Sequence, residues 1–508
     1  MENKLIYNVE DKPKFGKMLV FAFQQVLAVL AATILVPVII KLPVNIPSAI
    51  LGAGLGTIVY LLFTKFKSPV VISSSFAFLG ALGNALAFGY MGVALGAIFA
   101  GLVYVVIAII VKNFGTAWIN KLLPPVIIGP VVAVIGLSLA GNAAADVAEA
   151  TGSAFNGGYN LVGLLCGLIT FFTVVICSVQ EKSKGLKLVP FIIGIGAGYV
   201  AATIFSIIGY TADVDYLKII NWAPVVDNFS DIGVESFLSL PRLSLVEGIK
   251  ELVTGEISAD VLASYPKAQP LTWMGVAEVA LAFIPVAFVV FAEHIADHTN
   301  LGTIINRDLI NGEPGLDRTL LGDGVGSIVG TCFGVCPNTT YGESVGCIAI
   351  SKNASVRTIF TAAIMLIILA FLSPITAVLR TIPDCVMGGV CLTLYGFIAV
   401  SGLKMFKQVD LNKSKNLFTV SAILIAGIGG LSIQIPYHLA EIKNGAGEVI
   451  GQTPDKAITI TAIATALFLG IATYAICNLI EKKFGSTKAE EEAPAAAEEP
   501  AENAEENK

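Results

Sequence analysis

The chain has 508 residues, of which 55% are hydrophobic and only 13% are charged, and its formal net charge is −6. Soluble domains contain about one quarter charged residues, so a water-soluble fold could not hide this much apolar surface. The acidic balance, without a basic patch interleaved with aromatic residues, also excludes a nucleic-acid-binding protein. Apolar runs of membrane-spanning length recur along the chain instead, which predicts an all-α, polytopic protein of the lipid bilayer.

The first apolar run, Val20 to Ile40, follows a charged N-terminal stretch and has no small-residue cleavage motif behind it. It therefore predicts a permanent helix and not a removed signal peptide. Further runs, separated by charged residues or by Gly and Pro, bring the expected number of segments to about fourteen. These segments are 18–40, 46–63, 69–83, 90–111, 122–141, 159–180, 187–209, 274–297, 319–335, 338–351, 357–379, 385–403, 416–434 and 457–479.

Lysine and arginine are spread unevenly over the loops between these segments. One alternate set of loops carries most of them, including Lys65, Lys112, Arg307 and Lys404, and the opposite set is much poorer. Short cytoplasmic loops hold the cations of a membrane protein. We therefore expect an even number of spans, both termini in the cytoplasm, and a location in the cell membrane.

These boundaries predict five parts of the chain. A cytoplasmic N-terminus precedes two halves of seven segments each, an extracellular loop separates the halves, and an Ala/Glu/Pro-rich tail, expected to be disordered, follows them. In order, the parts are 1–16, 17–209, 210–270, 271–483 and 484–508.

Two segments are too polar to be ordinary spans. Ser73 to Phe78 places three hydroxyl groups in a row at membrane depth, and Cys336 to Glu343 places a proline, an amide, hydroxyls and a carboxylate there. Such backbone is tolerated in a bilayer only where protein or a water-filled cavity surrounds it. The two are the third and tenth segments, which are matching places of the two halves. This pattern indicates a transport site built on inverted repeats.

Ionisable residues inside spans mark a functional site by default. The eighth segment carries Glu293 and Asp297 on one helical face and His294 and His298 on a neighbouring face, and the tenth carries Glu343. Glu293, near a helix end, could also be a capping or snorkelling residue. The histidines have metal-ligand spacing, but the order is Glu-His-x-x-Asp-His and not His-Glu-x-x-His. We expect no metal and no cofactor, and interpret the histidines as pore-mouth or interhelical hydrogen-bonding groups.

The chemistry of these residues suits a cyclic imide, whose ring alternates N–H donors with C=O acceptors. Glu293 and Glu343 can accept hydrogen bonds from the ring N–H groups, while backbone amides near Phe76 or Gly342 donate to the carbonyls. Phe76 or Tyr341 can stack on the ring. Because burial disfavours the charged form of a carboxyl group, one of the two acids can also take up a proton.

Three strings make the chain recognisable: Ala292-Glu293-His294, Asn338 to Glu343, and Val386 to Gly389. With them the chain resembles the nucleobase:cation symporter-2 family, also called nucleobase-ascorbate transporters, from about Phe15 to Lys483, and most of all its uracil-carrying members. The resemblance implies two inverted repeats of seven segments, a core and a gate domain, and short antiparallel strands in segments 3 and 10. It places 122–141, 159–180 and 187–209 in the gate, and it implies a possible homodimer.

The resemblance also assigns roles to residues. Glu293 and Glu343 match the base-binding carboxylates, Phe76 and Gly342 match positions whose backbone N–H groups face the base, and Tyr341 lies beside them. Tyr395 matches a tyrosine that bonds to a polar residue of the eighth helix. The resemblance thus gives Glu293, Asp297 and Tyr395 as the residues of proton coupling.

Three departures from the family pattern bear on the coupling ion. The family often has Gln-His in the first helix where this chain has Gln24-Gln25, and Ser344 replaces an asparagine. Asp297 stands where the uracil-carrying members have a histidine. A carboxylate there can carry a proton or bind sodium, so the resemblance favours H⁺ as the coupling cation and leaves Na⁺ as the alternative.

The expected function is secondary active import of uracil with a proton. A purine-base permease of the same family, such as one for xanthine or urate and possibly sodium-coupled, is the alternative. Sulfate and bicarbonate carriers share the architecture, but two intramembrane carboxylates would repel their anions. An enzyme is not expected, because the chain offers no nucleophile–base pair and no intact metal motif.

Overall fold

The computed structural model describes residues 5–148, 158–181, 183, 186–187, 189–443 and 449–484, so most of the predicted tail lies outside the described residues. Each of the fourteen predicted segments falls on a helical element. Among the described residues, nine helices are long and apolar enough to cross a bilayer, and three further apolar helices are shorter. The ninth and tenth predicted segments, which are polar, are neither among the nine spanning helices nor among the three shorter apolar ones. The chain is therefore a mostly helical membrane protein, while fourteen crossings stay a prediction.

The two halves repeat one order of elements: two helices, a three-residue strand with a short helix, then further helices. The first half contains α1 (Phe15–Ile39), α2 (Ile46–Phe63), β1 (Ile72–Ser74), η2 (Phe76–Phe78), α3 (Leu79–Leu86), α4 (Gly89–Phe114), α5 (Ala117–Leu122), α6 (Pro125–Ser138), α7 (Ala140–Ala148), α8 (Leu161–Val179) and α10 (Pro190–Ala212). The second half contains α14 (Trp273–Ile305), α15 (Leu316–Phe333), β2 (Asn338–Thr340), α16 (Gly342–Ser351), α17 (Val356–Ala370), α18 (Ser373–Leu379), α19 (Asp384–Lys404), η5 (Met405–Gln408), α20 (Ser414–Ile428), β3 (Ile433–Lys443), β4 (Val449–Ile460) and α21 (Ala462–Phe484).

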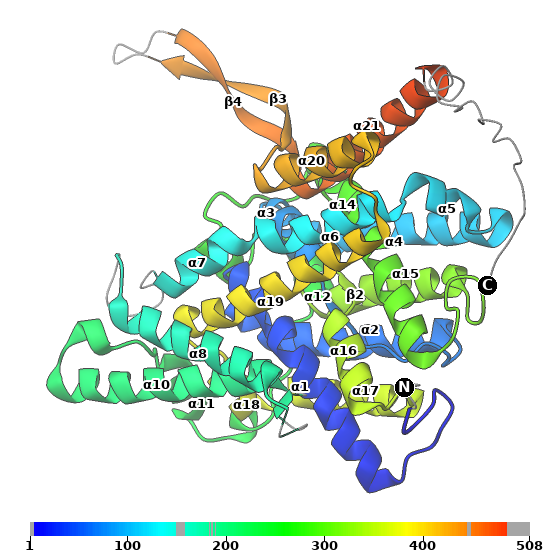
Figure 1. The fold of residues 1–508 in the computed structure, drawn as a ribbon. Coiled ribbons are helices and arrows are strands. Elements are labelled where there is room, and N and C mark those ends of the chain that lie inside the picture. Colours follow the sequence, from blue (N-terminus) through cyan, green and yellow to red (C-terminus); the bar gives the residue numbers. More distant parts are fainter. Residues whose placement is uncertain are drawn as a thin grey trace, which may run out of the picture.

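The helices pack as two groups (Figure 1). In the core group, α15 lies against α2 and α4, α14 packs on α4, and α17 packs on α1 and α2. In the gate group, α6, α7 and α8 pack on α19, α10 packs on α8, and α20 packs on α21 and α6. This arrangement agrees with the core and gate domains that the sequence led us to expect.

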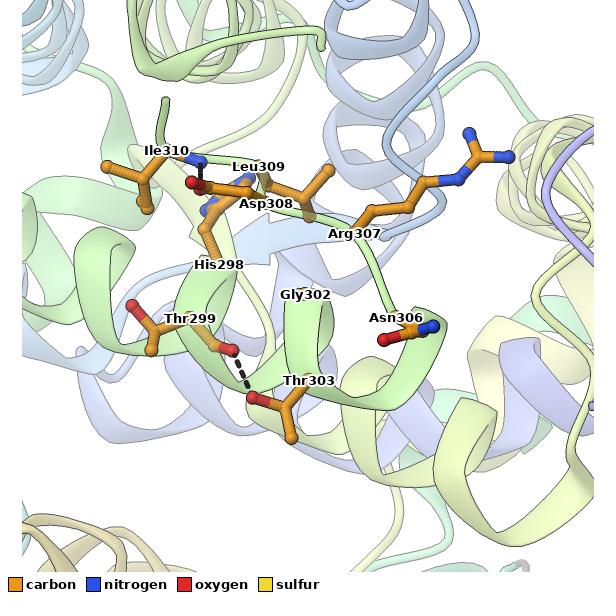
Figure 2. Close-up of a pocket in the computed structure, with 9 residues that line it drawn as sticks. All are labelled: His298, Thr299, Gly302, Thr303, Asn306, Arg307, Asp308, Leu309 and Ile310. Atoms are coloured by element: carbon orange, nitrogen blue, oxygen red, sulfur yellow. Dashed lines mark hydrogen bonds between the residues drawn. The ribbon is translucent and has the colours of Figure 1, made fainter. Parts of the chain in front are cut away.

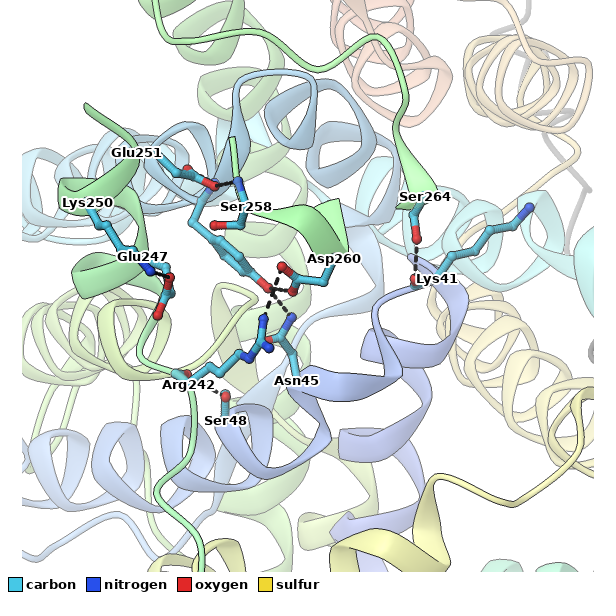
Figure 3. Close-up of polar contacts among 11 residues, drawn as sticks. Lys41, Asn45, Ser48, Arg242, Glu247, Lys250, Glu251, Ser258, Asp260 and Ser264 are labelled. Atoms are coloured by element: carbon cyan, nitrogen blue, oxygen red, sulfur yellow. Dashed lines mark hydrogen bonds and ion pairs between the residues drawn. The ribbon is translucent and has the colours of Figure 1, made fainter. Parts of the chain in front are cut away.

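Part of the segment between the halves is folded onto the core group. The segment contains α11 (Ala223–Phe229), α12 (Ser244–Thr254) and α13 (Ala259–Ser264). The carboxylate of Glu251 accepts the backbone N–H of Tyr90 at 2.8 Å, and the Tyr90 hydroxyl donates to Asp260 at 2.5 Å. Arg242 forms an ion pair with Asp260 at 3.1 Å (Figure 3). These contacts fasten α12 and α13 to the start of α4.

The hairpin of β3 and β4 was not predicted. The two strands pair antiparallel, from Ile433 opposite Ile460 to Lys443 opposite Val449, and project from the helical body (Figure 1). The predicted span 416–434 corresponds to α20, which already ends at Ile428. The strand that follows begins with Ile433, Gln434 and Ile435, an apolar–polar alternation that is typical of a strand and not of a helix.

Glycines allow α2 and α15 to approach closely beside β2. A Cβ added to Gly52 would lie 2.3 Å from the carbonyl oxygen of Gly330, and one added to Gly56 would lie 2.4 Å from Nδ2 of Asn338. That same Nδ2 donates to the Gly52 carbonyl at 2.9 Å. The close crossing of the two helices therefore holds β2 in place, as small residues do in membrane helix pairs.

Replacing Gly52 should loosen this crossing. We expect Gly52→Ala to destabilise the protein by about 1–3 kcal/mol, because the new methyl group overlaps a backbone oxygen that cannot move freely. Thermal unfolding in detergent measures the effect. Gly196→Ala on α10 is the matched control, since its Cβ would meet nothing within 4 Å. An unfolding temperature of Gly52→Ala equal to that of the wild type would contradict the proposed packing.

Candidate substrate site

The site begins with the pairing of β1 and β2. The strands are antiparallel, with Ile72 opposite Thr340 and Ser74 opposite Asn338, and all six residues are buried. The ladder continues on both sides, because Ser75 N–H donates to the Pro337 carbonyl at 2.9 Å and Tyr341 N–H to the Val71 carbonyl at 3.3 Å. Each broken segment thus satisfies the backbone of the other, and the short strands expected in segments 3 and 10 are confirmed.

Each strand leads directly into a helix start. η2 begins at Phe76 after β1, and α16 begins at Gly342 after β2. The first N–H groups of a helix have no partner within that helix, so both starts can donate to an acceptor between them. The Tyr341 hydroxyl donates to the Ser74 carbonyl at 2.5 Å. Tyr341 therefore joins the two strand ends, in addition to any contact with a bound ring.

Three carboxyl groups converge beside this crossing. Asp297 on α14 accepts the Thr340 hydroxyl at 2.9 Å. Glu293, one turn earlier on α14, interacts electrostatically with both Asp297 and Glu343 of α16. All three side chains are half-buried. They lie inside the helical body and still keep accessible surface, which is what residues that bind a small ligand require.

Gly342 lies opposite Asp297. A Cβ at Gly342 would come within 3.9 Å of a carboxyl oxygen of Asp297, an ordinary van der Waals distance, and would meet no other atom within 4 Å. Space for a small group therefore remains between the start of α16 and α14.

The gate group reaches the site through Tyr395 on α19. Its ring meets Phe76 edge to face, with the ring centroids 5.6 Å apart, and both residues are buried. The family resemblance implies a bond from this tyrosine to the eighth helix. Among the described residues its aromatic contact is with Phe76 instead, so its part in coupling stays a prediction.

Two of the residues that depart from the family pattern contact each other. The Ser344 hydroxyl donates to Gln25 Oε1 at 3.0 Å and accepts the backbone N–H of Val71 at 3.1 Å. Gln25 Nε2 also lies 3.4 Å from the Ser344 carbonyl. The pair joins α1, the residue before β1 and α16, so these two departures support the crossing of the strands.

Comparisons with known proteins decide the family. Residues 16–435 match the permease family. The chain belongs to that family. The uracil permease of Bacillus caldolyticus is 36% identical over 85% of this chain and 90% of its own length, and that of Bacillus subtilis strain 168 is 33% identical over 85% and 90%. The nucleobase:cation symporter-2 resemblance is thereby confirmed, and the chain is a permease and not an enzyme.

A solved structure agrees on the fold. The murine solute carrier 26 family member A9 anion transporter, in an inward-facing state, superposes with a TM-score of 0.56 at 9% identity. The match covers 93% of the permease and 69% of that chain. At this identity the likeness extends to the arrangement of helices alone.

One buried residue of the permease escaped the sequence analysis. Asp323 on α15 lies 2.7 Å from His294 Nδ1 and is 1% exposed. Its sequence signal was a carboxylate inside a predicted span, but the flanking Gly322 and Gly324 are residues that more often allow close packing of membrane helices. His294 and His298 hydrogen-bond across helices, to α15 and to Tyr60 of α2 respectively, so the interhelical interpretation is confirmed.

Gly342→Ala tests whether the space in front of Asp297 binds substrate. We expect the variant to fold with unchanged stability, because the added methyl meets only Asp297 at an ordinary distance, and to lose about tenfold or more in transport, equivalent to about 1.4 kcal/mol of binding. Uptake in vesicles and thermal unfolding measure the two effects. Gly396→Ala on α19, where a Cβ would meet nothing within 4 Å, should transport normally. If Gly342→Ala takes up substrate as fast as the wild type, the space in front of Asp297 is not part of the substrate site.

Proposed function

We propose that the permease imports uracil across the cell membrane by symport with a proton, and that Glu293 and Glu343 hold the base. The observation that carries this proposal is the convergence of the carboxyl groups of Glu293, Asp297 and Glu343 between α14 and the start of α16. The names of the relatives, which are uracil permeases, support the choice of base.

The binding chemistry follows from the groups at the strand crossing. Uracil presents two ring N–H donors, which suit the carboxylate oxygens of Glu293 and Glu343. Its two carbonyls suit the N–H groups at the starts of η2 and α16, near Phe76 and Gly342. Phe76 is an aromatic ring at the same level, and such a ring favours planar ligands. A sulfate or bicarbonate ion would meet three acids and no cation among these groups.

Coupling is assigned to Asp297, with Glu293 and Tyr395. Asp297 contacts β2 through Thr340 and interacts electrostatically with Glu343. Protonation of one acid of this group would lower the repulsion among the others as the base binds. Sodium bound at Asp297 would lower this repulsion in the same way, so Na⁺ is the alternative coupling ion.

Transport requires that the site open to each side in turn. We propose that the core group, with the site on it, moves against the gate group, and that the halves 17–209 and 271–483 are the two inverted repeats. The Phe76–Tyr395 contact would then open and close in each cycle. Both termini would lie in the cytoplasm, 210–270 would be extracellular, and a homodimer would form through the gate.

The identity of the base can be tested by competition. In vesicles, unlabelled uracil should compete best with labelled uracil, ahead of thymine, xanthine and adenine. Glu343→Gln replaces a carboxylate that accepts from the base, so uptake should fall about 10- to 100-fold, equivalent to the roughly 1.5–3 kcal/mol of a hydrogen bond to a charged group. Glu256→Gln, on an exposed loop residue, is the control. Stronger competition by xanthine would favour the purine alternative, and normal uptake by Glu343→Gln would refute its role.

The coupling ion can be tested with imposed gradients. In proteoliposomes, a proton gradient should drive uracil accumulation and a sodium gradient at equal pH should not. Asp297→Asn cannot take up the proton, so it should exchange uracil for uracil yet fail to accumulate it. Accumulation that survives collapse of the proton gradient but requires sodium would assign Asp297 to that ion instead.

A further inference from the structure

Behind the candidate site, α14 carries a buried polar cluster that base binding does not use. His294 and His298 connect α15 to α2 across α14. The members are between 0% and 1% exposed and comprise Tyr60, His294, His298, Thr319 and Asp323. Buried polar groups of this kind are costly in a bilayer unless every one is bonded. Their hydrogen bonds therefore limit where the protons can lie.

His294 and Asp323 can share one proton. When the Thr319 hydroxyl donates to the Leu316 carbonyl at 3.1 Å, it accepts from His294 Nε2 at 3.0 Å, and Nε2 then carries a hydrogen. His294 Nδ1 faces Asp323 Oδ2 at 2.7 Å. That contact needs one hydrogen, which is held either by Nδ1, giving an ion pair, or by Oδ2, giving two neutral groups.

His298 has the bonding pattern of a protonated ring. Its Nδ1 lies 2.9 Å from the His294 carbonyl, which can only accept. The Tyr60 hydroxyl, 2.7 Å from Nε2, donates to Ser68 at 2.7 Å, which leaves Nε2 to donate to Tyr60. Rotation of the Tyr60 hydroxyl hydrogen toward Nε2 gives the neutral pattern. One hydroxyl thus accommodates both states of the ring.

The two imidazole rings cannot both be charged. They stack with centroids 3.9 Å apart and an interplanar angle of 27°, where two cations would repel strongly. A proton that arrives on His298 therefore drives the shared proton of the neighbouring pair from His294 Nδ1 to Asp323 Oδ2. An N–H bond breaks, an O–H bond forms, and the negative charge of Asp323 disappears.

The cluster has one end at the surface and one at the candidate site. His298 lines a pocket of about 340 Å³ at the end of α14, together with Thr299, Asn306, Arg307 and Asp308 (Figure 2). Asp323 interacts electrostatically with Glu293 and Asp297. The charged and titratable groups around His298 are His294 and Asp297 on α14, Asp323 on α15, Tyr60 on α2, Tyr104 on α4, and Arg307 and Asp308 at the pocket.

We propose that His298 is a proton-sensing positioning residue: a proton taken from the surface pocket shifts the His294–Asp323 proton onto Asp323 and removes a negative charge beside the base site. With that charge removed, Glu293 and Glu343 ionise more readily and accept the base more strongly. This inference rests on the proposed function, since it acts through the same two glutamates.

Uracil binding as a function of pH tests the inference without any gradient. Uracil-induced thermal stabilisation in detergent gives the apparent affinity at a series of pH values between about 4 and 8, a range that extends below the one in which an exposed histidine titrates. All variants are made in Asp297→Asn, because the coupling proposed for Asp297 would itself make uracil binding depend on pH. In that background, affinity should rise at least about fivefold as pH falls through this range, within the usual size of a coupling between sites. His298→Gln stays neutral and can still accept from Tyr60, so adding it should remove this rise while affinity at the alkaline end is kept within about twofold.

Two further variants make the outcome decisive. Tyr60→Phe removes the hydroxyl that accepts from the charged His298 ring, so the rise in uracil affinity should disappear here too. This variant serves as the test if His298→Gln does not fold. His438→Gln, on β3, makes the same change elsewhere and should keep the rise. Persistence of the rise in His298→Gln, or in Tyr60→Phe, would overturn the inference, as would an equal loss of affinity at every pH. Absence of uracil binding by the wild type would instead refute the proposed function.

Discussion

The antiparallel pairing of β1 with β2 is the interaction on which the rest of the structure depends. Non-helical backbone at membrane depth must find partners within the protein, and here each strand is the partner of the other, with Ser73 opposite Thr339. The strands come from different halves of the chain, so neither broken segment is stable alone. Closing the crossing also brings two helix starts together, which provides donors at the same depth as the acids of α14.

Charge concentrates beside this crossing. Asp297 contacts β2 through Thr340 and interacts electrostatically with Glu293 and Glu343, while Asp323 lies against His294. Among the described residues, no lysine or arginine forms an ion pair with any of the four. Several negative charges close together are unfavourable in the low-dielectric interior of a membrane protein. Protons, a cation or a donor-rich ligand can balance them, and the proposed coupling of base binding to a cation builds on this.

Much of this arrangement was predictable from the sequence because polar residues inside apolar runs are conspicuous. The hydroxyls of Ser73 to Ser75 and the carboxylate of Glu343 revealed the broken segments, and spacing placed Glu293 and Asp297 on one face. Contacts between helices that are far apart in the sequence have no comparable sequence pattern. Asp323 was missed because its partner His294 is on another helix, and the register of Ile72 with Thr340 depends on the close crossing of α2 and α15. The hairpin was missed because 435–456 was assigned to the loop between the last two predicted spans.

Gln25 bears on which residues could carry the coupling proton or cation. A histidine at this place in the first helix would be a titratable group, and glutamine is not. Gln25 bonds to Ser344, itself a departure from the family pattern, and the two residues together keep α1 joined to α16. The carboxyl groups near the crossing lie on α14, α15 and α16, and these are the helices to which the proposed proton or cation coupling belongs, together with Tyr395 of α19.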